Sequence, residues 1–197
     1  MNDAIRTMLT RRSVRSYESE QITDEQLDAI LQCALYAPTS SNCQTSRFLV
    51  IQDGERLTRL NAAICKELAG REEREGQIMN VGIRAARKEG MNFFYGAPTL
   101  ITAVAPRDYD NSMANCAAGL ENIILAATSL GLGACWSNQA HWLTDVPEIR
   151  DIFEELGLRE DEDIFGSVEV GHPKHISQKE RPRKEGRIVL DISRELK

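Results

Sequence analysis

Residues 112–130 read SMANCAAGLENIILAATSL, a run rich in small and apolar residues. Gly131 ends the helix that the stretch predicts. Small and apolar residues leave the predicted helix little polar surface, so we expect it to be buried on nearly all sides. A domain core or a seam between two subunits would bury a helix in this way.

The segments around this helix alternate between extended and helical patterns. Toward the C-terminus they predict a strand at 99–105, a strand or tight turn at 133–137, a helix at 147–156, a strand at 164–171 and a final extended segment at 187–192. Toward the N-terminus, Ile5, Met8 and Leu9 predict a short helix. Thr23 and Gln26 form a capping box that begins a second helix, which Pro38 stops. A strand at 47–52 and a helix up to Gly70 follow.

Residues 70–96 have no clean period. Charged residues alternate there with scattered apolar ones, which indicates a mobile excursion and a candidate lid. The chain has 197 residues and 42% hydrophobic composition, so we expect one domain, 1–197, that includes this excursion.

Composition excludes several functional classes. The net charge of −6 gives no support for nucleic-acid binding. There is no apolar run like a signal-peptide core and none long enough to span a bilayer, so we expect a cytoplasmic protein that is not bound to a membrane. Five cysteines without a CxxC pair argue against a disulfide framework and a zinc ribbon. His172 and His175 fit a polar loop, and we expect no metal.

Three common motifs for nucleotide binding or catalysis are absent or incomplete. Gly131 and Gly133 could begin a dinucleotide-binding fingerprint, but its third glycine would fall at Trp136. The sequence has neither a GxxxxGK[ST] loop nor a GxSxG elbow, which argues against a P-loop hydrolase and a serine hydrolase.

Three separate stretches instead predict a site for a phosphorylated ring. Residues 11–15 read RRSVR and residues 181–184 read RPRK, in a chain that is otherwise acidic. One arginine guanidinium can donate hydrogen bonds to two phosphate oxygens at once, and a serine hydroxyl adds a further donor. Residues 38–44 read PTSSNCQ and offer amides and hydroxyls that can bind a ring edge. Phosphate together with a heteroaromatic ring suggests a nucleotide or a flavin.

The order of these motifs resembles the FMN-dependent nitroreductase family. The resemblance runs from about Arg11 to Arg187, and its most specific parts are Arg-x-Ser-x-Arg at 11–15, Asn-x-Gln at 42–44 and GLGACW at 131–136. It implies an α+β flavoprotein with a central, mostly antiparallel sheet flanked by helices. It also implies an intertwined homodimer that holds two FMN molecules at the subunit interface.

The resemblance assigns site residues by motif. Arg11, Ser13 and Arg15 would bind the FMN phosphate with Arg12 beside them, and Arg183, with Arg181, would close that site. The other residues it assigns match the loop that reaches the flavin, commonly from the partner subunit, and the segment near the isoalloxazine ring: Pro38, Thr39, Ser40, Asn42 and Gln44 for the loop, and Cys135, Trp136 and Ser137 for the segment. Thr45 and Ser46 stand where the family often has Pro-Trp, which leaves the pocket shape and the substrate open.

The activity that the resemblance implies is an NAD(P)H-dependent FMN oxidoreductase. NADH or NADPH would reduce the FMN, and a small conjugated acceptor such as a nitroaromatic or a quinone would then take the electrons, in ping-pong order. A family member specialised for dehalogenation or flavin breakdown is a second hypothesis. A protein that stores or senses FMN without useful turnover is a third.

Overall fold

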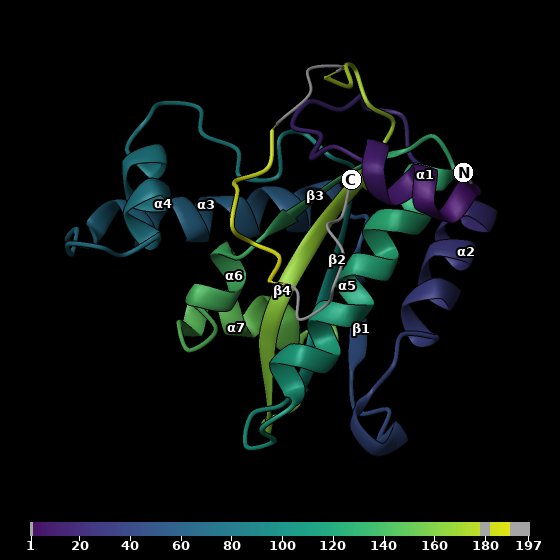
Figure 1. Ribbon diagram of the computed structural model, residues 1–197. Coiled ribbons are helices and arrows are strands. Elements are labelled where there is room, and N and C mark those ends of the chain that lie inside the picture. Colours follow the sequence, from purple (N-terminus) through teal and green to yellow (C-terminus); the bar gives the residue numbers. More distant parts are fainter. Residues whose placement is uncertain (1, 178–181, 190–197) are drawn as a thin grey trace.

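A four-stranded antiparallel sheet forms the centre of the computed structural model, which describes residues 2–177 and 182–189 (Figure 1). Its order is β1-β2-β4-β3, so β4 lies between β2 and β3. The strands are β1 (Arg47–Ile51), β2 (Thr99–Pro106), β3 (Gly133–Ser137) and β4 (Glu162–Gly171). The α+β class and the antiparallel sheet predicted from the sequence are confirmed.

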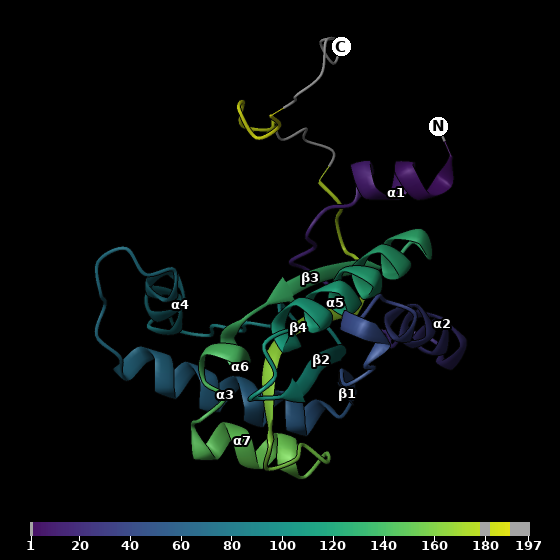
Figure 2. The ribbon, with the colours of Figure 1, turned by 60° about the horizontal axis from the view of Figure 1, so that its bottom comes forward.

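Helices cover both faces of the sheet (Figure 2). One face packs on α2 (Asp24–Leu35) and α5 (Ser112–Ser129), and the other on α3 (Gly54–Gly70) and α7 (Pro147–Glu154). The remaining helices are α1 (Asp3–Thr10), α4 (Met79–Ala86), the short α6 (Gln139–Trp142) and a 3-10 turn, η1 (Ser40–Asn42). Among the described residues, no helix is long and apolar enough to cross a membrane.

Most of the predicted elements form where the sequence placed them. The predicted capping box begins α2: the Thr23 hydroxyl accepts from the Gln26 N–H, and the Gln26 side chain accepts from the Thr23 N–H. The sequence also placed α3, α5 and α7 and all four strands to within about two residues. The predicted extended segment at 187–192 has no regular structure over residues 187–189, and its last part lies outside the described residues.

Two findings differ from the expectations. Residues 70–96 are not irregular throughout, because α4 forms within them, and Gly82 of α4 packs beside Trp142 of α6. The helix α5 is not buried on all sides within one chain: Ser112, Leu120 and Ile123 are buried, whereas Met113 is 43% exposed. Toward its C-terminal end, Leu125 and Ala126 line a groove that α1 and α2 also line.

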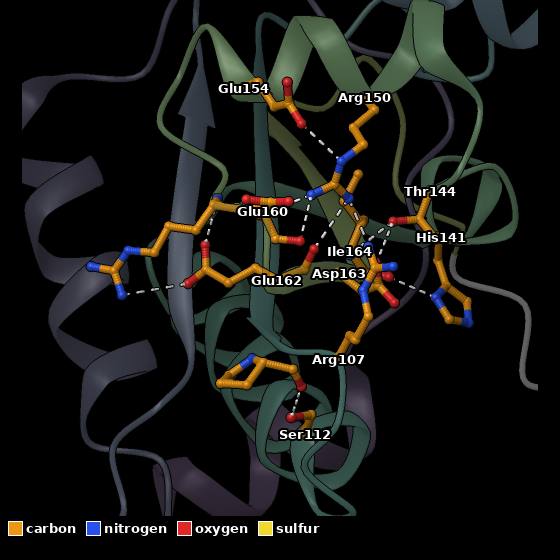
Figure 3. Close-up of polar contacts among 12 residues, drawn as sticks. Arg107, Ser112, His141, Thr144, Arg150, Glu154, Glu160, Glu162, Asp163 and Ile164 are labelled. Carbon is orange, nitrogen blue, oxygen red and sulfur yellow. Dashed lines mark hydrogen bonds and ion pairs between the residues drawn. The ribbon is translucent and has the colours of Figure 1, made fainter.

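A polar cluster fastens the beginning of β4 to α7 (Figure 3). Arg150 Nε donates to Glu154 Oε1 at 2.8 Å, and Arg150 Nη1 donates to the carbonyl of Glu162 at 3.2 Å. The buried carboxylate of Glu162 accepts from Arg47 at 2.6 Å and from the Arg159 N–H at 3.0 Å. These charges have protein partners, as buried charges require. The cluster therefore stabilises the structure.

Candidate functional site

The arginine-rich stretch at residues 11–15 lies along the edge of β3. After α1 ends, Ser13 forms a parallel bridge to Ala134, and the Val14 N–H donates to the Ala134 carbonyl at 3.0 Å. Gly133 allows this approach, because a Cβ there would lie 2.9 Å from the side chain of Val14. The backbone pairing fixes the direction in which each residue of the stretch points.

Arg11 and Arg12 line a cavity of about 400 Å³. Arg12 Nη1 donates to the carbonyls of Leu9, Thr10 and Arg11 at 3.1, 3.0 and 2.8 Å and so caps the end of α1. Its Nε is buried and has no hydrogen-bonding partner among the described residues. The guanidinium of Arg11 is only loosely paired, since its Nε lies 3.9 Å from Glu121.

This cavity suits an anion. Besides the two arginines, it is lined by Thr10, Val14, Thr128, Leu132, Ile176 and Ser177. Arg11 offers a charge that the protein itself compensates weakly, and Arg12 offers a buried N–H donor without a partner. Both features fit a phosphate group. Ile176 and Ser177 bring the chain that follows β4 to the same cavity.

Arg15 does not line this cavity. Its guanidinium lies over the ring of Tyr95, 6.0 Å from the centroid, and interacts electrostatically with Cys135 and Glu169. Ser13, two residues earlier, interacts with Cys135. Burial raises the pKa of the Cys135 thiol to about 11, so this thiol is neutral at physiological pH.

The segment 135–137 divides its side chains between the two faces of the sheet. Cys135 and Ser137 lie on one face, directly across from Glu169 and Ser167 of β4. Trp136 lies on the other face against α5, where its Nε1 donates to Asn138 at 2.7 Å. Within one chain, then, Trp136 belongs to the core beneath α5.

The loop at 38–44 lies at the opposite end of α5 from the arginines (Figure 1). Ser40 N–H donates to Asn115 Oδ1 at 3.0 Å, and Asn111 Nδ2 donates to Ser40 Oγ at 3.1 Å. By contrast, Thr128 near the other end of α5 lines the arginine cavity. At about 1.5 Å per residue, Asn115 and Thr128 are separated by about 20 Å along the helix. One chain does not bring the two predicted halves of the site together.

Within the loop, side chains hold an unusual backbone. Ser41, Asn42 and Gln44 all have positive φ, at 50°, 55° and 49°. The Thr39 hydroxyl accepts from the Gln44 N–H at 3.2 Å, and Gln44 Nε2 donates to Asn42 Oδ1 at 3.1 Å. Pro38, Asn42 and Gln44 are exposed, so the loop presents its amides to the outside.

The C-terminal arginines are placed only in part. Arg183 is exposed, and Arg181 lies outside the described residues. No group of three or more His, Cys, Asp or Glu within the described ranges could hold a metal ion.

The sequence reading missed Glu169. This residue of β4 is 0% exposed and neighbours Cys135 and Arg15. A charged residue in the mostly apolar second half of β4 was the available signal. It could not be interpreted without knowing that β4 is a central strand covered on both faces.

A second cavity, of about 170 Å³, lies beneath α4. Its lining includes Gly82 and Ala85 of α4, Trp142 of α6, and Tyr95. The guanidinium of Arg15 lies over the ring of Tyr95, so Tyr95 is adjacent both to the cavity beneath α4 and to the stretch at 11–15.

Comparison with known proteins identifies the family of the chain. A nitroreductase from Bacteroides fragilis, solved with bound FMN, is 31% identical, with a TM-score of 0.86 over 96% of this chain and 99% of that chain. Another FMN-bound nitroreductase, from Desulfitobacterium hafniense, is 26% identical, with a TM-score of 0.84 over 97% of this chain and all of that one. An FMN reductase (NADPH) of Bacillus subtilis is 28% identical over 93% of this chain and 70% of its own length. The model of the nitroreductase family matches residues 8–172, and the chain therefore belongs to the nitroreductase family.

Proposed function

We propose that this chain is an FMN-dependent oxidoreductase that uses NADH or NADPH. The observation that carries the proposal is the cavity of about 400 Å³ that Arg11 and Arg12 line, where the guanidinium of Arg11 is only loosely paired and Arg12 Nε has no hydrogen-bonding partner among the described residues. Relatives named as FMN reductase (NADPH) and NADPH-flavin oxidoreductase support the choice of donor.

The residues of the chain bind and orient the cofactor. Arg11 and Arg12 hold the phosphate, and Ser13 and Arg15 extend the contact toward Cys135 and Tyr95. Bound FMN supplies two-electron chemistry, between the nicotinamide and a small conjugated acceptor such as a nitroaromatic or a quinone, in ping-pong order. Arg15, which lies over the ring of Tyr95, would add a positive charge to the site and so favour an anionic group bound there. No side-chain nucleophile is required.

A homodimer completes the site. The loop at 38–44 lies about 20 Å of helix away from the arginines of its own chain, so it serves the site of a second copy. The copies meet on an apolar face formed by α1, α2 and α5. There Met8 is 56% exposed and Tyr36 is 86% exposed, and both line a groove of about 380 Å³ that Leu125 and Ala126 of α5 also line. A second copy would cover these side chains.

The segment at 70–96 acts as a lid over the acceptor pocket. α4 roofs the cavity of about 170 Å³ that Tyr95 and Trp142 also line, and Ile78 and Val81 beside it are 70% and 58% exposed. Replacing Val81 by tryptophan should change the ranking of acceptors in steady-state assays and leave the FMN content unchanged. Loss of the flavin in that variant would contradict the lid assignment.

The first test is the visible spectrum of the purified protein before and after anaerobic addition of NADH and then NADPH. We expect a flavin spectrum that bleaches with at least one donor. A protein that binds FMN without being reduced by either donor would favour storage or sensing of FMN. A colourless protein that cannot be reconstituted with FMN would contradict the proposal.

Substitution then tests the phosphate site. The variant Arg11→Ala should weaken FMN binding by about 1.5–3 kcal/mol, the usual contribution of a hydrogen bond to a charged group. Its matched control is Arg6→Ala, because Arg6 is an exposed arginine of α1 paired at 3.0 Å with Asp3. Equal FMN affinity in the two variants would remove the phosphate assignment.

A further inference from the structure

Glu169 is a buried carboxyl in the central strand β4. It lies in the middle of the sheet, across from Leu100 of β2 on one side and Cys135 of β3 on the other, and it is 0% exposed. Neither carboxylate oxygen has a hydrogen-bonding partner among the described residues. Burying an unpaired carboxylate costs several kcal/mol. The side chain is therefore most stable in its protonated form.

Titratable groups from three segments surround this carboxyl. Cys135 comes from β3, Arg15 and Tyr17 come from the N-terminal stretch, and Tyr95 comes from the turn before β2. Tyr17 donates its hydroxyl proton to the carbonyl of Val14 at 2.9 Å, and burial raises its pKa. Burial likewise raises the pKa of Tyr95 and of Cys135. Arg15 is thus the member of this group that carries a charge at neutral pH.

Burial also raises the pKa of Glu169, to about 8, although Ser137, Arg15 and Cys135 favour its charged form. The carboxyl therefore changes charge near physiological pH. When it is protonated, nothing in this group opposes the charge of Arg15. When it is ionised, it attracts the guanidinium toward the sheet, where the low dielectric makes the attraction strong.

An anion bound at Arg15 and a carboxylate at Glu169 consequently compete for one guanidinium. We propose that Glu169 is a positioning residue that, by holding a proton, leaves Arg15 available to the anionic cofactor, so that FMN binding and protonation of Glu169 favour each other. The inference rests on the proposed function, in which Arg15 contacts FMN. By linkage, FMN must lower the acid dissociation constant of Glu169 by the same factor by which protonation tightens FMN binding, and must therefore raise its pKa.

The test is the FMN affinity of the apoprotein, measured by fluorescence titration between about pH 6.5 and 9.5. In the wild type, binding should weaken about five- to tenfold as the pH rises through the pKa of Glu169, which is the usual size of such coupling. In the variant Glu169→Gln, this change in FMN affinity should disappear. The pH dependence that comes from ionisation of FMN itself should remain. Above pH 9 the variant should bind FMN more tightly than the wild type.

Two further measurements separate positioning from a general structural effect. In the background of Arg15→Gln, the substitution Glu169→Gln should no longer change the pH profile, as a double-mutant cycle requires. Infrared difference spectra of the wild type should show a protonated carboxyl band that Glu169→Gln lacks and that persists to higher pH once FMN is bound. If Glu169→Gln fails to fold, Glu169→Met takes its place in both experiments.

The outcomes are distinguishable. FMN binding with the same pH profile in the wild type and in Glu169→Gln would overturn this inference and leave the proposed function intact. The same conclusion follows if bound FMN does not raise the pH at which the protonated carboxyl band disappears. Absence of FMN binding by the wild type at every pH would overturn both.

Discussion

Cys43 is the residue whose chemistry best reports on the loop at 38–44. Asn115 Nδ2 donates to its sulfur at 3.3 Å, and its sulfur lies 3.5 Å from the Thr45 hydroxyl. The Thr45 side chain and N–H lower the pKa of Cys43 to about 7. Because the thiolate is the nucleophile, alkylation of Cys43 by iodoacetamide should rise steeply from about pH 5 to pH 7 and level off above about pH 8.

The same reaction tests where the loop lies in the loaded protein. If the loop covers the flavin of the partner subunit, FMN should slow alkylation of Cys43. Cys33 lines the groove that a second copy would cover, so its rate should report dimer formation and not FMN binding. Peptide mass spectrometry gives the rate at each cysteine. Cys116 and Cys135 are buried, and burial raises the pKa of both to about 11, so they should react slowly with or without FMN. Equal rates at Cys43 in the two states would contradict the assignment.

Local sequence motifs were enough to name some residues of the candidate site and not others. The sequence named Arg11 and Arg12, which do share a cavity. It could not separate Arg15 from them, because the pairing of Ser13 and Val14 with Ala134 determines which way each side chain points. It could not find Glu169 either, since a single strand does not reveal that both of its faces are covered.

Gly166 shapes the central strand β4. Its φ is 145°, and the pairing of β2 with β4 shifts register here, with Ala103 opposite Gly166 and Val104 opposite Ile164. A Cβ at Gly166 would lie 2.9 Å from Leu120. The glycine thus allows both the β-bulge and the close approach of α5.

Substitution of Gly166 by alanine should therefore destabilise the protein. Backbone strain at such a φ costs about 1–3 kcal/mol, and the overlap with Leu120 adds to it. The free energy of unfolding from urea denaturation measures the effect. Gly54→Ala in α3 is the control, because a Cβ there meets nothing within 4 Å and should be neutral or stabilise slightly. Equal stabilities of the two variants would show that the bulge tolerates a side chain.

The helices were predictable where the sequence carries a local signal, such as an apolar period, a cap, or a proline or glycine at one end, and not where tertiary contacts decide. α2 begins with a complete capping box, whereas α4 has no side-chain cap. Ile78 and Val81, beside and within α4, remain exposed, which hides its apolar period, and the contact of Gly82 with Trp142 joins residues far apart in the sequence. Such a contact cannot be read from local spacing.

At the scale of the whole molecule, two independent features point to a second copy of the chain. α5 holds the loop at 38–44 near one end and lines the arginine cavity near the other, so one chain does not assemble both halves of the site. The apolar groove among α1, α2 and α5 leaves Met8 and Tyr36 exposed. An isologous dimer would cover that groove and bring each loop to the arginines of the other chain.

Complementation between two defective chains tests this arrangement. One variant carries Arg11→Ala and Arg12→Ala, and the other carries Asn42→Ala and Gln44→Ala. Each alone should bind FMN weakly, because every site in its homodimer has one defective half.

Refolded together in equal amounts, the two should form mixed dimers in which one site joins an intact loop to intact arginines. Absorbance titration should then recover about a quarter of all sites, the fraction expected from random pairing of a two-fold dimer. If each chain built its whole site alone, mixing would restore none, and the FMN content of the mixture would be the average of the two variants.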